Sequence, residues 1–278
     1  MRSAAVLISI NILGLACSTA SAQDPVKTDP KHWSAVIETN QFRILRLNLE
    51  GGGRSKTYQL GPSMALYVTD YRVRVTSFDG KTAERRSDAG SLAWKLPEGE
   101  SVENLTLERE ETIFVELKNG RALAPQLLGT ALPKDFQDSV SFDQEALAVL
   151  ARRVESGESI SDRETTRAND AVQDLEMKSS WVEQRPSGSP MVEVKVNTLD
   201  QKNGEAPGCE VWYVPYAWRD TPSRWERFDR LSTPTAKALP VGRYEMWTRK
   251  SEREGEHRPV SPGDDAKKTK EVDLPAPK

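Results

Sequence analysis

Apolar and polar residues alternate in short runs through most of this chain, and this two-residue period constrains the fold more than any other feature. Tyr71, Val73 and Val75, for example, alternate with two arginines. Successive side chains of a strand point to opposite faces, so each run predicts a strand with one buried face. Asp79-Gly80 is a strong signal for a two-residue hairpin turn. Many short strands between turn residues predict an all-β barrel or sandwich in residues 33–118.

The alternation changes phase once, in residues 42–49. Phe42 and Ile44 keep one phase and Leu47 and Leu49 keep the other, so that Ile44 and Leu45 stand side by side. An extra residue in a strand shifts the phase in this way. We therefore predict a β-bulge at the Ile44-Leu45 step.

Residues 119–190 have a different period and predict a connector with a two-helix hairpin. The first helix is expected over residues 141–154, where Ser141 and Gln144 resemble a capping box and Gly157 supplies a stop. Ser161 and Glu164 repeat the capping signal for a second helix. Its apolar residues then follow at helical spacing: Ala168, Ala171, Val172 and Leu175.

The two-residue period returns in residues 191–274 and predicts a second, smaller β region. Cys209 lies directly before the apolar run 211–214, so we expect it to be a buried apolar residue. The chain thus reads as mainly β, with two β modules joined by helices.

The N-terminus predicts export. Arg2, an apolar run over residues 6–15 and Ala20-Ser21-Ala22 are typical of a signal peptide of residues 1–22, followed by a polar leader of residues 23–32. The run is too short to span a bilayer, and we expect no membrane-spanning segment in the mature chain. We place the mature protein in the periplasm or outside the cell. In an alternative reading, Leu15-Ala16-Cys17-Ser18 resembles a lipobox and Cys17 carries a lipid anchor.

The charge balance argues against a nucleic-acid partner. The 278 residues include 39 basic and 42 acidic side chains, which are well mixed along the chain. A nucleic-acid-binding domain shows a basic patch or stripe instead.

Residues 33–118 resemble a cupin domain. Gly52 starts a stretch similar to the first cupin motif, and Pro97-Glu98-Gly99 is similar to the turn of the second, with the Asp79-Gly80 hairpin between them. The resemblance implies a β-barrel whose interior usually holds a metal on histidines.

The expected ligand positions of that barrel carry other residues: Tyr58, Leu60, Met64, and Ser101 or Val102. The chain has two histidines, His32 in the leader and His257 in a charged run. Transition metals in proteins use His, Cys or carboxylate ligands. We therefore expect no metal, no cofactor and none of the metal-dependent cupin chemistry. Tyr58, Leu60, Met64 and Ser101 either fill the core or line a pocket for a small ligand.

Residues 191–274 resemble PEGA-like and carboxypeptidase-regulatory-like modules, which are small Ig-like β-sandwiches. The matching stretches are 206–214, 232–235 and 239–245. Modules of this kind pack, space or bind. The chain departs from them in a longer insert, residues 215–231, which we call the aromatic insert. Its aromatic residues are candidates for surface binding: Tyr216, Trp218, Trp225 and Phe228. The alternative is that they fix the insert onto the sandwich.

Three functions follow from these patterns. The favoured one is a non-enzymatic binding or structural module of the bacterial envelope, with a small ligand, a polysaccharide or an envelope protein as partner and no catalytic residues. The second is a metal-independent cupin-type enzyme acting on a small molecule or sugar, in which Tyr58, Gln59 and Arg74 would supply acid–base groups. The third is carbohydrate or cell-wall binding through the aromatic insert.

Overall fold

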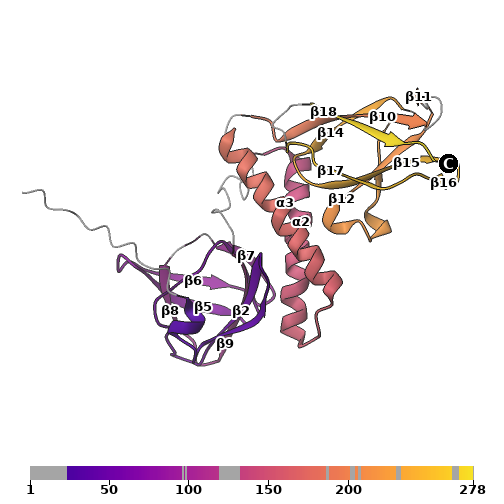
Figure 1. Cartoon of the computed structure of the whole chain (residues 1–278). Coiled ribbons are helices and arrows are strands. Elements are labelled where there is room, and N and C mark those ends of the chain that lie inside the picture. The colour runs from indigo at the N-terminus through magenta and orange to yellow at the C-terminus, as the bar shows by residue number, and fades with distance from the viewer. Residues whose placement is uncertain are drawn as a thin grey trace, which may run out of the picture.

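The computed structural model describes residues 24–277 except residues 96, 98, 119–131, 186–187, 201–203, 206–207, 230–232 and 265–268. The predicted signal peptide, the Cys17 lipid anchor and most of the apolar connector lie outside the described residues. Figure 1 shows three parts: an N-terminal β-barrel, a pair of long helices, and a C-terminal β region on the other side of the helices.

Two antiparallel sheets form the barrel. The first has the order β1-β2-β9-β4-β7 and the second β3-β8-β5-β6. The strands of the first sheet are β1 (Trp33–Glu38), β2 (Phe42–Leu49), β9 (Glu110–Leu117), β4 (Ser63–Tyr67) and β7 (Leu92–Lys95). Those of the second are β3 (Tyr58–Gln59), β8 (Gly99–Asn104), β5 (Tyr71–Ser77) and β6 (Thr82–Ser87). The predicted hairpin at Asp79-Gly80 is confirmed, with Gly80 at a φ of 80° between β5 and β6.

The first sheet is buried on both of its faces, and this explains the change of phase in residues 42–49. Ile44 packs outward with the helices, whereas Leu45 points into the barrel core with Leu47 and Leu49. The predicted bulge at Ile44-Leu45 is wrong, because β2 pairs with β9 without interruption. The irregularity lies in β1 instead, between Ala35 and Ile37. Two adjacent apolar residues can both be buried when each face of a sheet is covered.

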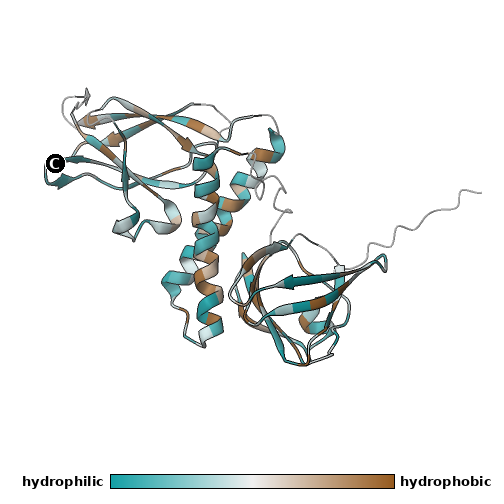
Figure 2. Ribbon diagram, turned by 180° about the vertical axis from the view of Figure 1, so that it is seen from behind, coloured by the Kyte–Doolittle hydropathy of each residue, from teal (hydrophilic) through white to brown (hydrophobic). Residues whose placement is uncertain are grey.

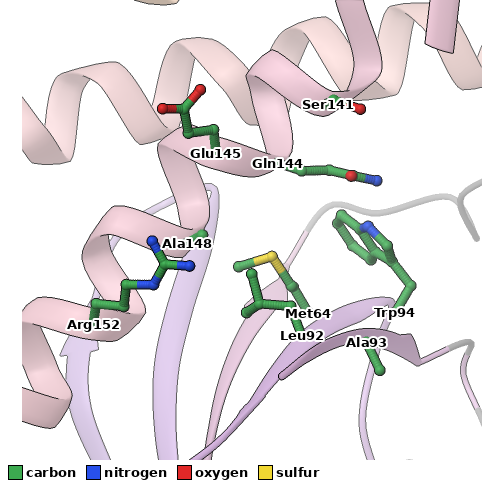
Figure 3. Close-up of a pocket in the computed structure, with 9 residues that line it drawn as sticks. All are labelled: Met64, Leu92, Ala93, Trp94, Ser141, Gln144, Glu145, Ala148 and Arg152. Atoms are coloured by element: carbon green, nitrogen blue, oxygen red, sulfur yellow. The ribbon is translucent and has the colours of Figure 1, made fainter. Parts of the chain in front are cut away.

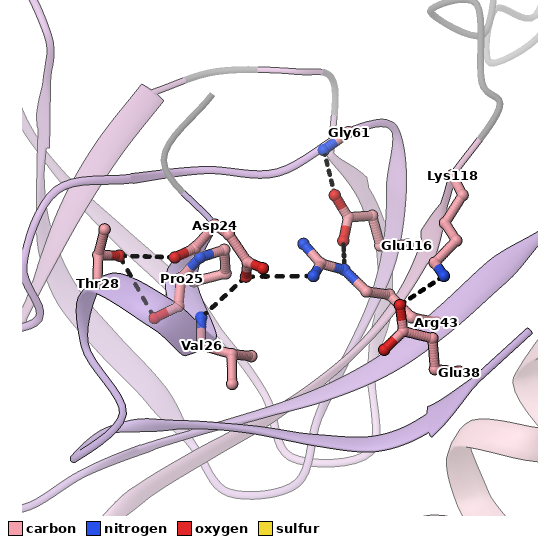
Figure 4. Close-up of polar contacts among 9 residues, drawn as sticks. All are labelled: Asp24, Pro25, Val26, Thr28, Glu38, Arg43, Gly61, Glu116 and Lys118. Atoms are coloured by element: carbon pink, nitrogen blue, oxygen red, sulfur yellow. Dashed lines mark hydrogen bonds and ion pairs between the residues drawn. The ribbon is translucent and has the colours of Figure 1, made fainter. Parts of the chain in front are cut away.

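A short helix and a network of ion pairs connect residues 24–28 to the barrel. Helix α1 (Pro25–Thr28) contacts β1 and β3, and its Val26 packs against the barrel core. Arg43 lies between the carboxylates of Asp24 and Glu116, and Glu116 accepts a hydrogen bond of 2.7 Å from the backbone N–H of Gly61 (Figure 4). These contacts tie the α1 segment to strands β2 and β9 of the barrel.

The two helices are α2 (Lys134–Ser156) and α3 (Asp162–Gln184). Helix α2 begins two turns before the predicted start, directly after Pro133, and the Ser141 hydroxyl donates to the carbonyl of Gln137 instead of capping. The Gly157 stop is confirmed, because this residue adopts the left-handed conformation at a φ of 70°. The capping box of Ser161 and Glu164 is also present.

The helices bury their apolar faces against the outer face of the first sheet. Phe42, Met64 and Val115 of the barrel share one core with Leu147 and Val172 of the helices. Figure 2 shows hydrophobic and hydrophilic residues interleaved along both helices, as expected for amphipathic helices. Each fully buried apolar side chain stabilises the folded state by about 1.5–3 kcal/mol relative to an exposed one. The shared core therefore holds the helices firmly on the outer face of the first sheet.

The C-terminal part consists of two sheets that face a common core. One contains β10 (Met191–Asp200), β11 (Gly204–Glu205), β14 (Thr235–Pro240) and β18 (Thr269–Pro275), with β18 parallel to β10. The other contains β12 (Glu210–Pro215), β13 (Glu226–Arg227), β15 (Tyr244–Lys250), β16 (Arg253–Glu254) and β17 (Arg258–Val260). Val194, Val211 and Met246 lie in their shared core, and Cys209 is buried as expected.

The aromatic insert does not present its rings to solvent as a surface site. Phe228 is fully buried in the core of the C-terminal sheets. Trp218 ends the short helix η2 (Tyr216–Trp218) and is 6% exposed. Its indole Nε1 donates to the carbonyl of Phe142 on α2 at 3.1 Å, and the Arg167 guanidinium of α3 lies 4.5 Å from its ring centre. The prediction of surface binding is therefore corrected for these two residues.

Tyr216 and Trp225 are half-buried and also contact the protein itself. The guanidinium of Arg219 lies 4.2 Å from the Tyr216 ring centre, and that of Arg243 lies 4.5 Å from it. Trp225 donates to the carbonyl of Arg219 at 3.1 Å, and its ring meets that of Trp247 edge-on. A second short helix, η3 (Pro222–Arg224), places Arg224 within 2.8 Å of Glu145 on α2. The insert thus joins the C-terminal sheets to the helices.

We predict that Trp218→Ala lowers the free energy of unfolding by about 3–5 kcal/mol, because it leaves a cavity between α2, α3 and the insert. Urea denaturation followed by circular dichroism measures the loss. The control is Leu107→Ala, since Leu107 is 99% exposed and its removal should change stability by less than ~0.5 kcal/mol. Equal stability of the Trp218 and Leu107 variants would contradict the joining role of the insert.

Candidate functional site

The inside of the barrel contains a cavity of about 230 Å³ at one end. Seven residues line it: Tyr58, Leu60, Arg85, Trp94, Lys95, Glu100 and Phe114. They come from both sheets. In the alternation of the strands, Arg85, Lys95 and Glu100 share the inward face with core residues such as Val73, Ala93 and Val102, whereas Trp94 follows Ala93 and its ring packs on the outer face. The cavity therefore combines an aromatic wall with four polar side chains.

Glu100 is the centre of the polar contacts in this cavity. Its Oε1 accepts a hydrogen bond of 3.0 Å from the Tyr58 hydroxyl, and its Oε2 lies 3.3 Å from the Arg85 guanidinium. The Glu100 side chain is 8% exposed, whereas that of Arg85 is 38% exposed. Burial, together with the adjacent Glu100 charge, raises the pKa of Tyr58 well above its usual value. Tyr58 therefore stays protonated and acts as a hydrogen-bond donor.

Glu110 is a second buried carboxyl group of the barrel. It is 2% exposed, and neither of its oxygens makes a hydrogen bond of normal geometry to another described residue. Burial raises the pKa of Glu110 to about 7, against the opposing effects of the Lys95 charge and of the nearby Thr112 hydroxyl. Such a group is neutral in mildly acidic solution and ionises close to neutral pH.

Lys95 brings a positive charge between this carboxyl group and the cavity. Its Nζ lies 5.8 Å from the ring centre of Tyr71, whose own pKa is raised well above the usual value by burial and by the Glu110 charge. Two tyrosines, two glutamates and two cations thus converge inside one barrel.

The structure brings together two of the four predicted pocket residues. Tyr58 and Leu60 line the barrel cavity. Met64 points the opposite way, to the helices, because its neighbour Ala65 takes the inward position on β4. Ser101 is buried, but it lies between the inward residues Glu100 and Val102 and accepts a hydrogen bond of 3.2 Å from Arg54 on the other face of β8.

The acid–base groups named from the sequence are only partly in place. Arg74 points outward, where it pairs with Glu103. Gln59 follows the inward Tyr58 on β3 and is half-buried, outside the residues that line the cavity. The sequence pattern missed Arg85, Lys95 and Glu100. Arg85 lies between Glu84 and Arg86, so its strand looks exposed on both sides, and only its pairing with Val73 places it inward.

A second cavity, of about 280 Å³, lies between the barrel and α2. Met64, Leu92 and Trp94 form its barrel side, and Gln144 and Arg152 extend from α2 on the other (Figure 3). Trp94 borders both cavities, and its indole ring points towards α2 on the cleft side (Figure 3).

The residues that the structure describes contain neither a cluster of metal ligands nor a helix that could cross a membrane. No three His, Cys, Asp or Glu side chains among them are grouped closely enough to hold a metal ion. No helix among them is both long and apolar enough to cross a membrane.

No protein-family model matches the sequence, and the curated proteins give no match. Similar solved structures include cupin and double-stranded β-helix domains. A cupin domain from Bordetella pertussis Tohama I is 12% identical, with a TM-score of 0.29 over 31% of this chain and 91% of that chain. A protein with a double-stranded β-helix domain from Klebsiella pneumoniae is 18% identical, with a TM-score of 0.27 over 32% and 76%. A cupin-superfamily sugar phosphate isomerase from Silicibacter pomeroyi is 18% identical, with a TM-score of 0.25 over 34% and 64%. At these identities and TM-scores no activity transfers to this chain.

Proposed function

We propose that the barrel cavity binds a small molecule that carries a carboxylate, and that the protein acts as a binding module without a metal. The observation that carries this proposal is the inward placement of Arg85 and Lys95 beside the aromatic wall of the cavity. Ligand sites typically combine an apolar wall with a few polar groups that fix orientation. A volume of about 230 Å³ suits a molecule the size of one ring with its substituents.

The charges of the cavity favour an anion. Arg85 and Lys95 outnumber Glu100 among the lining residues, which leaves one net positive charge. Arg85 is the more exposed partner of its ion pair and offers the planar fork of N–H donors that matches a carboxylate. Tyr58 and Phe114 supply ring faces and edges for the body of the ligand.

The same cavity also supports acid–base catalysis as a second candidate function. The specific observation is the hydrogen bond from the protonated Tyr58 to Glu100 at the cavity wall. Glu100 would be the proton acceptor and Tyr58 the donor that orients it. Turnover of a bound carboxylate that is lost in Glu100→Gln, with binding retained, would favour this candidate over simple binding.

The cellular setting remains the one proposed from the sequence. Export rests on Arg2, the apolar run and the Ala20-Ser21-Ala22 site. The PEGA-like character of residues 191–274 rests on their sequence resemblance. In this proposal the C-terminal sheets attach or space the barrel within the bacterial envelope.

We predict that the protein binds glucuronate or benzoate at least about tenfold more tightly than the neutral counterparts glucose and benzamide, because only the carboxylates pair with Arg85 and Lys95. Isothermal titration calorimetry measures the four affinities. Arg85→Gln should weaken carboxylate binding about tenfold or more. Arg74→Gln, on the outward face of the neighbouring strand, is the matched control and should leave it unchanged. Equal binding of charged and neutral probes would refute an anion site.

We also predict that carboxylate affinity falls as the pH rises from 6 to 8. Below its pKa of about 7, Glu110 is neutral and adds no negative charge near Lys95. Above that pH, Glu110 gains a negative charge that offsets part of the positive potential of Lys95 and repels the ligand, which should weaken binding by about tenfold. Benzoate is a suitable probe because its own charge is constant over this range.

The control for this pH dependence is Glu110→Gln, which keeps the shape of the side chain without its charge. Its affinity for benzoate should stay level between pH 6 and 8. A wild-type profile that is flat, or a variant profile that still falls, would contradict the role assigned to Glu110.

A further inference from the structure

A buried cluster of ionisable groups joins the two helices. None of its residues lines the barrel cavity. Lys178 of α3 is fully buried, and its Nζ lies 2.5 Å from Oδ2 of Asp143 on α2. The same Nζ lies 3.1 Å from Oδ2 of Asp174, one turn earlier on α3, and donates to the carbonyl of Ser139 at 3.2 Å. The three side chains are 0%, 1% and 6% exposed, so solvent hardly reaches them.

Burying these three side chains in their charged forms costs free energy. Charges buried in a protein interior lose their hydration, and a buried ion pair is often no more stable than apolar residues of the same size. Burial raises the pKa of Asp143 to about 8, which favours the protonated form of its carboxyl group, while the two aspartates raise the pKa of Lys178. The other oxygen of this group, Oδ1, has no hydrogen-bond partner among the described residues.

Asp174 is held in place by the turn between β14 and β15. Its Oδ1 accepts a hydrogen bond of 2.5 Å from the backbone N–H of Arg243. Gly242 lies against the carboxylate so closely that a Cβ atom there would be 3.1 Å from Oδ2 and 3.3 Å from the Lys178 side chain. The C-terminal sheet therefore presses the Asp174 carboxylate towards Lys178.

We propose that Lys178 and Asp143 form an intramolecular amide bond between their side chains, with Asp174 transferring the protons. Three groups lie within reach of one another: the Lys178 amine, the Asp143 carboxyl group and the Asp174 carboxylate as proton acceptor. The Asp143 carbon that is attacked lies one bond beyond the oxygen that contacts Nζ. Groups held in such a geometry react as if at very high concentration. The inference is independent of the ligand proposed for the barrel.

The step balances within the triad. The Asp174 carboxylate takes one proton from the Lys178 ammonium, and the neutral Nζ attacks Cγ of the protonated Asp143. The N–Cγ bond forms, the Cγ–OH bond breaks, and the departing hydroxyl leaves as water with a proton relayed by Asp174. The products are one amide, one water molecule and a neutral Asp174, so neither atoms nor charge are gained or lost.

The products also suit the site better than the reactants. A buried ammonium and a buried carboxylate are replaced by uncharged groups, which removes their desolvation cost. The water has a way out, because Ser139 and the neighbouring Tyr244 line a cavity of about 380 Å³ between α2 and the C-terminal sheets.

Mass spectrometry of the purified full chain tests the proposal. We expect the wild-type protein to be lighter than its sequence by one water molecule, and a digest to contain one branched peptide that joins the Asp143 and Lys178 segments. Trypsin should not cleave after Lys178. A wild-type protein with unlinked peptides and normal cleavage after Lys178 would overturn the proposal, whether or not any variant folds.

Two variants separate the roles of the residues. In Asp143→Asn the same amide forms with loss of ammonia, so its linked product and that of the wild type must have identical mass and identical branched peptides. Different masses would overturn the assignment of the bond.

In Asp174→Asn the proton acceptor is lost, and the amount of branched peptide should fall at least tenfold. Linking to the wild-type extent in this variant would overturn the role of Asp174.

Discussion

The burial of both faces of one sheet is the constraint on which the rest of this structure depends. Strands β2, β9 and β4 send alternate side chains into the barrel core and into the core shared with the helices. A sheet of this kind cannot stand at the surface, since either exposed face would leave a large apolar area in water. The helices α2 and α3 are therefore required by the barrel, and the C-terminal sheets are positioned in turn by their contacts with the helices.

The helices meet the C-terminal sheets through apolar contacts, such as those of Ala146 and Ala171 with Val214 and Trp247, and through directional polar and aromatic contacts. Asp170 of α3 pairs with both Arg219 and Arg243, and Trp218 reaches the backbone of α2. Arginines stack on Trp218 and Tyr216 in the same region. Such contacts depend on direction, so they fix the orientation of the sheets as well as their attachment.

Local patterns in the sequence predicted the strands, the hairpin at Asp79-Gly80 and the second helix, because turn and capping chemistry depends on residues that are close in the chain. They failed where a distant segment decides the outcome. The phase change at Ile44-Leu45 looks like a bulge unless the helices that cover Ile44 are known. The parallel pairing of β18 with β10 joins segments about 75 residues apart, and no local signal marks it.

The candidate site shows the same limit. Tyr58 and Leu60 were found through family resemblance, but the charged residues of the cavity were not, because Arg85 and Lys95 look like ordinary surface residues in the sequence. The side of a strand that faces inward is set by pairing across the sheet, as for Arg85 opposite Val73. The burial of Phe228 and Trp218 likewise follows from partners on other elements.

Strand β7 has a consequence of a different kind. It stands at the edge of its sheet, and its successive side chains face two spaces: Lys95 lines the barrel cavity, whereas the Trp94 ring lies in the cleft under α2 (Figure 3). A displacement of this strand moves a wall of both cavities at once. The shapes of the two spaces are therefore coupled through the backbone of β7.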